Sequence, residues 1–274
     1  MSVVTAAATY LYCAVQSARD PLRGAGARPP RGLPGAGPLR ALRAGDGVWL
    51  VVASAPLDRY AADVIDARLA DLDWVSRCAV AHDAVVEHLA RRHAVIPMKL
   101  FTLFTSDERA VAHVARGRKK LDRLFARVTD REEWGVRLLL DEKRALVLDS
   151  QAPGGAAAAR SGGGSMAAVT GTEFLARKKA AKDARQQVVA HALAEADRLH
   201  DALTALADDS RRRTPAVEGP TSRMVLDAAF LVRRRDTPKF RAAASAAART
   251  LRARGFELSL TGPWPPYHFV ADEA

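Results

Sequence analysis

The chain has 274 residues, 49% hydrophobic and 27% charged, a balance typical of a globular protein and not of a disordered one. Its 42 Lys and Arg residues outnumber 31 Asp and Glu residues, and the net charge of +11 admits nucleic acid, anionic lipid or an acidic protein as a partner. No apolar run reaches the ~18 residues that span a bilayer, the N-terminal apolar stretch lacks the basic flank of a signal peptide, and the two cysteines, Cys13 and Cys78, are too few for a disulfide framework. These features predict a cytoplasmic globular protein with two buried thiols.

The N-terminal half alternates segments that predict strands and helices. Residues 10–15 and 48–52 are apolar runs that predict two neighbouring buried strands. Residues 20–38, between them, are rich in Gly, Pro and Arg and predict a solvent-exposed loop. Over residues 72–93 apolar side chains recur every three or four positions, which predicts an amphipathic helix.

A proline, a serine and a glycine indicate where strands and helices begin or end in the next segment. Pro97 lies within the apolar segment 95–104, and because proline has no donor for the ladder it predicts an edge strand or a bulge. Ser106 is a favourable N-cap for a helix, and Gly117 separates that helix from a second one over residues 118–128.

A change of composition predicts a domain boundary. Residues 134–140 predict the strand that closes an N-terminal domain of residues 1–149. Glycine and alanine then dominate residues 150–170, which predicts a flexible linker before a C-terminal domain of residues 171–274.

The C-terminal domain opens with a long predicted helix that ends near residue 207. Its apolar seam can pair with a coiled-coil partner or pack along the sheet of its own domain, and we favour the second interpretation. The seam consists of Val189, Ala192, Ala196, Leu199, Leu203 and Leu206. A strand over 224–232, a helix over 238–254 and a strand over 256–260 complete the domain, so we predict the α+β class for both domains, each with an antiparallel or mixed sheet packed with helices.

The polar clusters of the sequence do not form a catalytic constellation. His82 and His88 project about 240° apart on one helix and cannot share a metal, so we predict His82 to be a core histidine bonded to a backbone carbonyl. The carboxylate pairs at 132–133 and 141–142 flank a strand, where a solvated strand end is the ordinary explanation. We therefore predict no catalytic residue, no metal and no cofactor.

The last strand runs into Gly262-Pro263-Trp264-Pro265-Pro266-Tyr267. The prolines remove backbone donors and fix φ, so we expect the strand to stop and a stiff extended segment to follow. Trp264 and Tyr267 then either cover the end of the sheet as a lid or form a rigid aromatic anchor at a protein interface, and both functions are compatible. As partner-binding residues we predict Trp264, Pro265, Pro266, Tyr267, Arg233 and Arg234.

This ending closely resembles the C-terminus of the gas vesicle accessory proteins of the GvpL/GvpF family. Three further segments carry the resemblance in the family's order: the Tyr-Leu-Tyr strand of 9–15, the His-containing helix and Pro-Met-Lys-Leu strand within 82–100, and the Glu-Trp-Gly-Val strand of 131–138. Lys99 and His268 depart from the family's usual arginine and small polar residue, but both keep a donor. The resemblance covers nearly the whole chain and implies two α+β domains, with ferredoxin-like character in the C-terminal one.

The resemblance also implies a function. Such a protein would bind the small hydrophobic shell protein GvpA and other accessory proteins during vesicle nucleation and growth, without catalysis, in the cytoplasm and associated with the vesicle. The alternative is a basic nucleic-acid-binding or regulatory protein, although the basic clusters are short and do not interleave with aromatic residues. A third hypothesis, an enzyme with a site assembled from scattered residues, would require a deep polar pocket.

Overall fold

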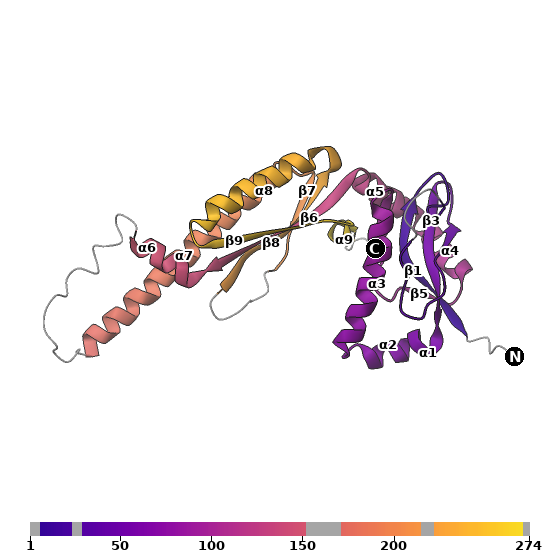
Figure 1. Cartoon of the computed structure of the whole chain (residues 1–274), viewed down its shortest axis with the longest axis horizontal. Helices are drawn as coiled ribbons and strands as arrows, with labels where there is room; N and C mark the ends of the chain where they lie inside the picture. The colour runs from indigo at the N-terminus through magenta and orange to yellow at the C-terminus, as the bar shows by residue number, and fades with distance from the viewer. Residues whose placement is uncertain (1–5, 24–28, 152–170, 215–221, 271–274) are drawn as a thin grey trace. The chain divides into compact units, whose positions relative to one another are not determined.

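The computed structural model describes residues 6–23, 29–151, 171–214 and 222–270 (Figure 1). The chain forms two compact units: the first comprises Met1–Glu133 and Pro263–Ala274, and the second comprises Trp134–Gly262. Both contain an antiparallel sheet packed with helices, which confirms the predicted α+β class. None of the helices within the described ranges is both long enough and apolar enough to span a membrane.

The boundaries of the two units differ from those of the predicted domains, which were residues 1–149 and 171–274. The chain passes between the units twice, at Glu133–Trp134 and again at Gly262–Pro263, so the C-terminal segment belongs to the first unit. The predicted linker over 150–170 lies outside the described residues except for its first two positions, which are the end of a helix.

The first unit is built around β1 (Ala7–Gln16). β3 (Val48–Pro56) pairs with it on one side, and β4 (Ala94–Pro97) and β5 (Leu103–Phe104) pair with it on the other. The short strand β2 (Arg40–Arg43) adds to the outer edge of β3. The predicted pairing of the first two long strands is confirmed, whereas β2 was not predicted.

Both faces of β1 are buried, which explains its continuous apolar sequence. Tyr10 and Tyr12 face one side of the sheet, while Leu11 and Ala14 face the other. A register shift between Leu11 and Cys13 places Cys13 on the same side as Tyr12. Helices can therefore cover both faces of this sheet.

Three helices of the first unit begin where the sequence predicts. α3 (Leu72–Ala90) contributes to the core on the tyrosine side, and α4 (Asp107–Arg116) and α5 (Arg118–Val128) contribute to the core on the other side. The Ser106 hydroxyl accepts a hydrogen bond from the backbone of Arg109 at 3.3 Å, which confirms the predicted N-cap. Two short helices that the sequence analysis did not predict, α1 (Leu57–Tyr60) and α2 (Ala62–Arg68), precede α3.

Two predictions for the first unit are wrong in part. The segment predicted as an exposed loop contains Leu33, which is 2% exposed and whose backbone N–H donates to the Tyr12 hydroxyl at 2.8 Å. The apolar segment 95–104 is not one strand, because a turn in which Phe101 has a φ of 64° separates β4 from β5. The edge position predicted from Pro97 is confirmed, since β4 ends the main strand order of the sheet.

His82 is buried in the core, as predicted, and it contacts the Met98 backbone as well as a side chain. The Tyr10 hydroxyl lies 2.7 Å from His82 Nδ1, and the Tyr12 ring stacks on the imidazole with centroids 5.6 Å apart. Burial lowers the pKa of His82 below its ordinary value, so the neutral ring is favoured. Cys13 and Cys78 are buried and free, as predicted.

The second unit has the ferredoxin-like arrangement that the resemblance implied. Its strands are β6 (Arg131–Asp141), β7 (Asp209–Arg212), β8 (Ser222–Arg233) and β9 (Phe256–Trp264), and their order in the sheet is β7-β8-β6-β9. Helices connect the first strand to the second and the third to the fourth, and the first strand lies between the third and the fourth. The expectation that β6 closes the N-terminal domain is therefore wrong, because β6 is an inner strand of the second sheet.

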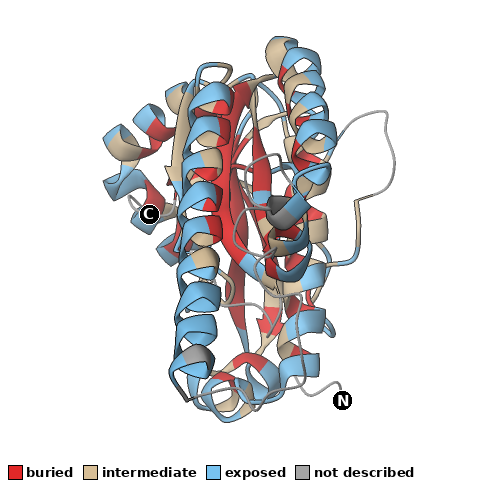
Figure 2. Cartoon of the chain, turned by 90° about the vertical axis from the view of Figure 1, so that its left-hand side faces the viewer, coloured by how far each residue is buried: buried red, intermediate tan, exposed pale blue. Residues whose placement is uncertain are grey.

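The helices of the second unit are α6 (Glu142–Gln151), α7 (Gly171–Thr204) and α8 (Thr237–Arg252). The predicted seam of α7 packs into one core with Trp134 and Phe230 of the sheet and Phe240 of α8, which confirms packing within its own domain. Buried side chains run along the sheet and the second half of α7, whereas the first half of α7 is exposed (Figure 2).

The prolines do not stop the last strand where we expected. β9 continues through Pro263 to Trp264. It lies at the edge of its sheet, so one side of the strand needs no ladder donor and a proline is tolerated there.

Replacing Tyr10 by Phe should lower the free energy of unfolding by about 1–3 kcal/mol. The change keeps the ring but leaves His82 Nδ1 without its hydroxyl partner inside the core. Chemical denaturation at pH 7.5 measures the effect, with Val80→Ala on the exposed side of α3 as a control expected to stay within about 0.5 kcal/mol. Equal stability of the two variants would contradict this account of the core.

Stability should also decrease as the pH falls from 7 to 5. Because the pKa of His82 is lower in the folded protein than in the unfolded chain, neutral His82 contributes fully above about pH 6.5 and the contribution is lost as the pH falls toward the folded pKa. His82→Gln should reduce the slope of unfolding free energy against pH in this window, by at most about 1.4 kcal/mol per pH unit. An unchanged slope would show that His82 does not titrate differently in the two states.

Candidate functional site

The C-terminal segment Trp264–Val270 divides into a buried part and one exposed aromatic residue. Pro265 and Pro266 are buried, and the single-turn helix α9 (Tyr267–Val270) places Phe269 in the interior beneath the Arg127 guanidinium, 5.9 Å from the ring centre. Trp264 is 42% exposed. The residues after Trp264 thus pack into the first unit and not over the sheet that β9 joins, which is not the lid that the sequence predicted. The side chain of Trp264 stays exposed.

Tyr267 is fixed by a hydrogen bond across the first unit. Its hydroxyl donates to Asp83 Oδ1 of α3 at 2.6 Å. Burial and the neighbouring Asp83 carboxylate raise the pKa of Tyr267, so the hydroxyl remains protonated and remains a donor. This bond joins residues that are far apart in the sequence.

His268 supplies the partners of a buried carboxylate. Glu133 is 3% exposed, and its Oε2 accepts the backbone N–H of His268 at 2.9 Å while Oε1 contacts the His268 imidazole Nδ1. We had expected Glu133 to be a solvated strand end, and this expectation is wrong because the C-terminal segment covers it. Its role here is to hold the segment in place.

The other two predicted partner-binding residues belong to the second unit. Arg233 ends β8 and its Nε lies 2.8 Å from Asp208 Oδ2. Arg234 begins the short 3-10 turn Arg234–Asp236 and is exposed. Trp264 to Tyr267 belong to the first unit, so the six predicted residues are not brought together within one unit.

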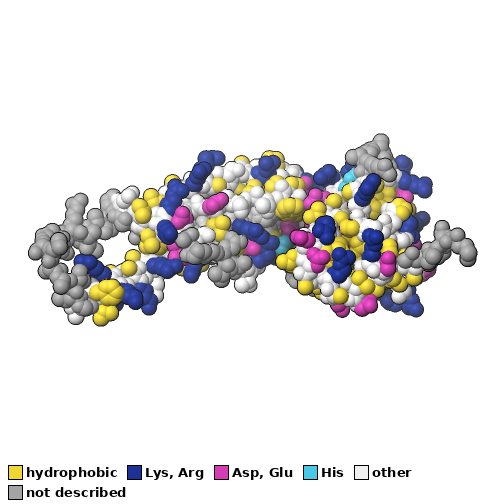
Figure 3. All heavy atoms as spheres, turned by 60° about the horizontal axis from the view of Figure 1, so that its bottom comes forward, with side chains coloured by type: hydrophobic (Ala, Val, Ile, Leu, Met, Phe, Trp, Pro, Cys, Tyr) yellow, Lys and Arg dark blue, Asp and Glu magenta, His cyan; other side chains and the backbone are white. Residues whose placement is uncertain are grey.

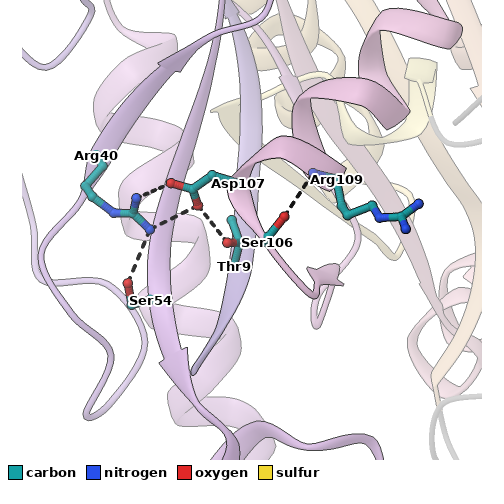
Figure 4. Close-up of polar contacts among 6 residues, drawn as sticks. All are labelled: Thr9, Arg40, Ser54, Ser106, Asp107 and Arg109. Atoms are coloured by element: carbon teal, nitrogen blue, oxygen red, sulfur yellow. Dashed lines mark hydrogen bonds and ion pairs between the residues drawn. The ribbon is translucent and has the colours of Figure 1, made fainter. Parts of the chain in front are cut away.

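A second polar cluster, which the sequence analysis missed, ties three strands of the first unit to a helix (Figure 4). The Arg40 guanidinium of β2 contacts both oxygens of Asp107, the first residue of α4, and also donates to the Ser54 hydroxyl of β3 at 3.2 Å. The Thr9 hydroxyl of β1 donates to Asp107 Oδ1 at 2.7 Å. The N-cap Ser106 marked the start of α4, but nothing in the sequence links Arg40 to it.

The Asp107 carboxylate acts as an acceptor and not as an acid or base. Burial alone would raise the pKa of Asp107, but the hydrogen bonds from Arg40 and Thr9 and the charge of Arg40 lower it overall. The carboxylate therefore stays ionised and its lone pairs are used by bidentate and hydroxyl donors. The cluster fixes the edge of the sheet.

A cavity of about 520 Å³ lies beside α7 in the second unit. Its lining combines apolar side chains, among them Leu140, Leu148 and Phe256, with the polar side chains of Gln187, His191, Glu195 and Arg254. Glu195, also in the lining, contacts Arg198 and Arg254 at 2.6 Å each, so its charge is compensated. No group of His, Cys, Asp or Glu in the described ranges has the geometry of a metal site.

Glu133→Gln should loosen the C-terminal segment. The amide keeps the shape of the side chain but removes the charge that the His268 donors stabilise. We therefore expect the free energy of unfolding to fall by about 1–3 kcal/mol. Hydrogen exchange should show the Phe269 amide exchanging at least tenfold faster, while amides of β8 in the second unit stay unchanged. Unchanged protection of Phe269 would show that the contact to Glu133 does not hold the segment.

Comparison with known proteins agrees with this architecture. The sequence matches the family of the gas vesicle synthesis protein GvpL/GvpF over residues 8–271. It is 32% identical over 251 residues to gas vesicle protein L of Streptomyces sp. (strain CB03234), with 89% of each chain covered. The fold is similar to crystal structures of the gas vesicle protein GvpF from Anabaena sp. PCC7120 (TM-score 0.67, 17% identity, 96% and 95% of the two chains covered) and from Microcystis aeruginosa (TM-score 0.62, 15% identity, 96% and 98% covered). This chain therefore belongs to the GvpL/GvpF family of gas vesicle synthesis proteins.

Proposed function

We propose that this protein binds the small hydrophobic shell protein GvpA and other accessory proteins during nucleation and growth of a gas vesicle, and that it does so without catalysis. The family match over residues 8–271 carries the proposal. The protein would act in the cytoplasm, in association with the vesicle. A small apolar shell subunit needs a protein partner that covers its surface before it polymerises.

Trp264 is the contact residue that the structure supports best. It is 42% exposed, and buried Pro265 and Pro266 follow it directly in the chain. A tryptophan held by a stiff backbone loses little conformational freedom on binding, and tryptophan is enriched among the residues that dominate interface energies. Pro265, Pro266 and Tyr267 would contribute indirectly, because they fix the position of Trp264.

Arg233 and Arg234 remain proposed contacts of the second unit. Arg234 is exposed and Arg233 is half-buried at the end of β8, where Arg233 forms an ion pair with Asp208. We expect each to contribute little to affinity, because exposed ion pairs are screened and weak. Their effect should be on orientation and on the rate of association.

Co-purification of the tagged protein with the shell protein tests the proposed function directly. Retention of the shell protein at both about 0.1 M and about 1 M salt is expected, because apolar contact persists where charge is screened. Absence of the shell protein at both salt concentrations would refute the proposal. Nucleic acid in a low-salt eluate would favour the alternative of a basic nucleic-acid-binding protein, for which the basic stretch Arg177–Lys182 on α7 is the supporting observation.

Trp264→Ala should weaken binding of the shell protein by about 2 kcal/mol or more while the melting temperature stays unchanged. Tyr267→Phe should instead lower the melting temperature, because it removes the bond to Asp83. Val80→Ala is the matched control for loss of an exposed apolar side chain. Binding by titration calorimetry and stability by thermal unfolding separate these effects, and a fall in stability without a change in affinity for Trp264→Ala would show that Trp264 is structural.

A further inference from the structure

The first half of α7 is an exposed basic helix. From Phe174 to Gln186 the helix carries five basic side chains and one carboxylate, and all of these residues are exposed except the half-buried Ala184. The basic residues are Arg177, Lys178, Lys179, Lys182 and Arg185. We call this segment the basic arm.

Apolar side chains accompany the charges of the basic arm. Phe174 is 60% exposed and Leu175 is 64% exposed. In Figure 3, basic and hydrophobic side chains lie next to each other over the start of α7, at the left of the view. Arg185 pairs with Glu142 of α6, but the three lysines have no ion pair with any carboxylate in the described part of the chain. The arm therefore presents uncompensated positive charge beside an apolar surface.

The first unit carries a surface with the opposite charge and the same apolar character. The stretch from Leu57 to Asp73 spans α1, α2 and the start of α3. It contains five exposed aspartates and only two arginines. The aspartates are Asp58, Asp63, Asp66, Asp71 and Asp73. Leu69 and Leu72 are 51% and 75% exposed within this stretch, which we call the acidic corner.

Some charges of the acidic corner are already used within the unit. Asp71 caps α3 by accepting the Trp74 N–H at 3.0 Å and lies 3.8 Å from Arg68, whose guanidinium also stacks on the Trp74 ring. Asp63, Asp66 and Asp73 are exposed and have no ion pair with a basic residue in the described ranges. These three carboxylates equal the three lysines of the basic arm in number and are opposite to them in charge.

We propose that the basic arm of one copy binds the acidic corner of a second copy of this chain. The two surfaces are different, so the contact is heterologous: each copy offers one arm and one corner, and association extends into open chains or closes into a ring. This inference does not depend on the binding of the shell protein.

The size of the arm sets the expected strength of the contact. Thirteen helical residues extend about 20 Å, which gives an interface at the low end of specific protein contacts. We therefore expect a dissociation constant on the order of 10–100 µM at low salt, and a steep loss of association as salt screens the charges. The net charge of +11 opposes any contact between copies, so the association that remains must come from local complementarity.

Sedimentation velocity over a range of concentrations tests the proposal on the full chain. The wild type should associate at about 50 mM salt and dissociate at about 500 mM salt. Reversing the arm by Lys178→Glu, Lys179→Glu and Lys182→Glu should weaken association at least tenfold, and so should reversing the corner by Asp63→Lys, Asp66→Lys and Asp73→Lys. Circular dichroism confirms that each exposed triple variant is folded.

Mixing the two triple variants provides the decisive measurement. Each variant alone has an arm and a corner of the same charge and therefore no complementary pair. The mixture pairs the negative arm of one variant with the positive corner of the other, and the two native surfaces with each other. Association should therefore return on mixing. Arg116→Glu, Lys119→Glu and Arg123→Glu on α4 and α5 make the same change of charge elsewhere and should not weaken association.

Four results would overturn the proposal. A wild type that stays monomeric at low salt and high concentration excludes the contact, as does an association that neither triple variant changes. Triple variants that fail to associate after mixing would show that the charge reversals act by another route. A monomeric protein that retains nucleic acid through the three lysines would assign the basic arm to that partner.

Discussion

The buried carboxylate of Glu133 constrains the whole chain. A buried carboxylate is costly unless donors compensate it, and the described partners of Glu133 are the backbone and imidazole of His268, 135 positions later. Glu133 is the last residue of the N-terminal part of the first unit, immediately before the chain enters the second unit. The first unit therefore reaches its native state when β9 has been placed and the C-terminal segment has returned. A long sequence separation of this kind slows folding, because the chain must close the loop before the contact stabilises it.

The return of the segment also explains why its aromatic residues differ in function. Tyr267 can be buried because Asp83 accepts its hydroxyl hydrogen bond, and Phe269 can be buried because it has no polar group to satisfy. Trp264 precedes the buried prolines and remains exposed at the end of β9. The same motif thus provides both the attachment and the exposed side chain. A stiff proline segment is suited to this division, because it keeps one side chain at a set distance from the others.

Local features of the fold could be predicted from the sequence, whereas long-range ones could not. The apolar runs of β1 and β3, the stripe of α3 and the cap at Ser106 are properties of neighbouring residues, and the structure confirms them. The strand β6 was also predicted. The alternation of apolar and polar residues along it would be the same in either sheet, so the sequence does not indicate which sheet the strand joins. The strands β2 and β7 were missed because they are short and polar, and their position beside β3 and β8 makes them strands.

The same distinction applies to the candidate site and to the charge of the chain. The Pro-Trp-Pro-Pro-Tyr sequence singles out Trp264 and Tyr267, but the pairs Tyr267–Asp83 and Arg40–Asp107 leave no periodic signal because their members are distant in sequence. The net charge indicates an anionic partner only if the charges are free. Arg40, Arg213 and Arg233 each pair with an aspartate of their own unit, so these arginines are not free to attract a partner. The first half of α7 is different, because its three lysines are exposed and have no ion pair with a described carboxylate. The position of the charges, and not their sum, therefore determines which surface can attract a partner.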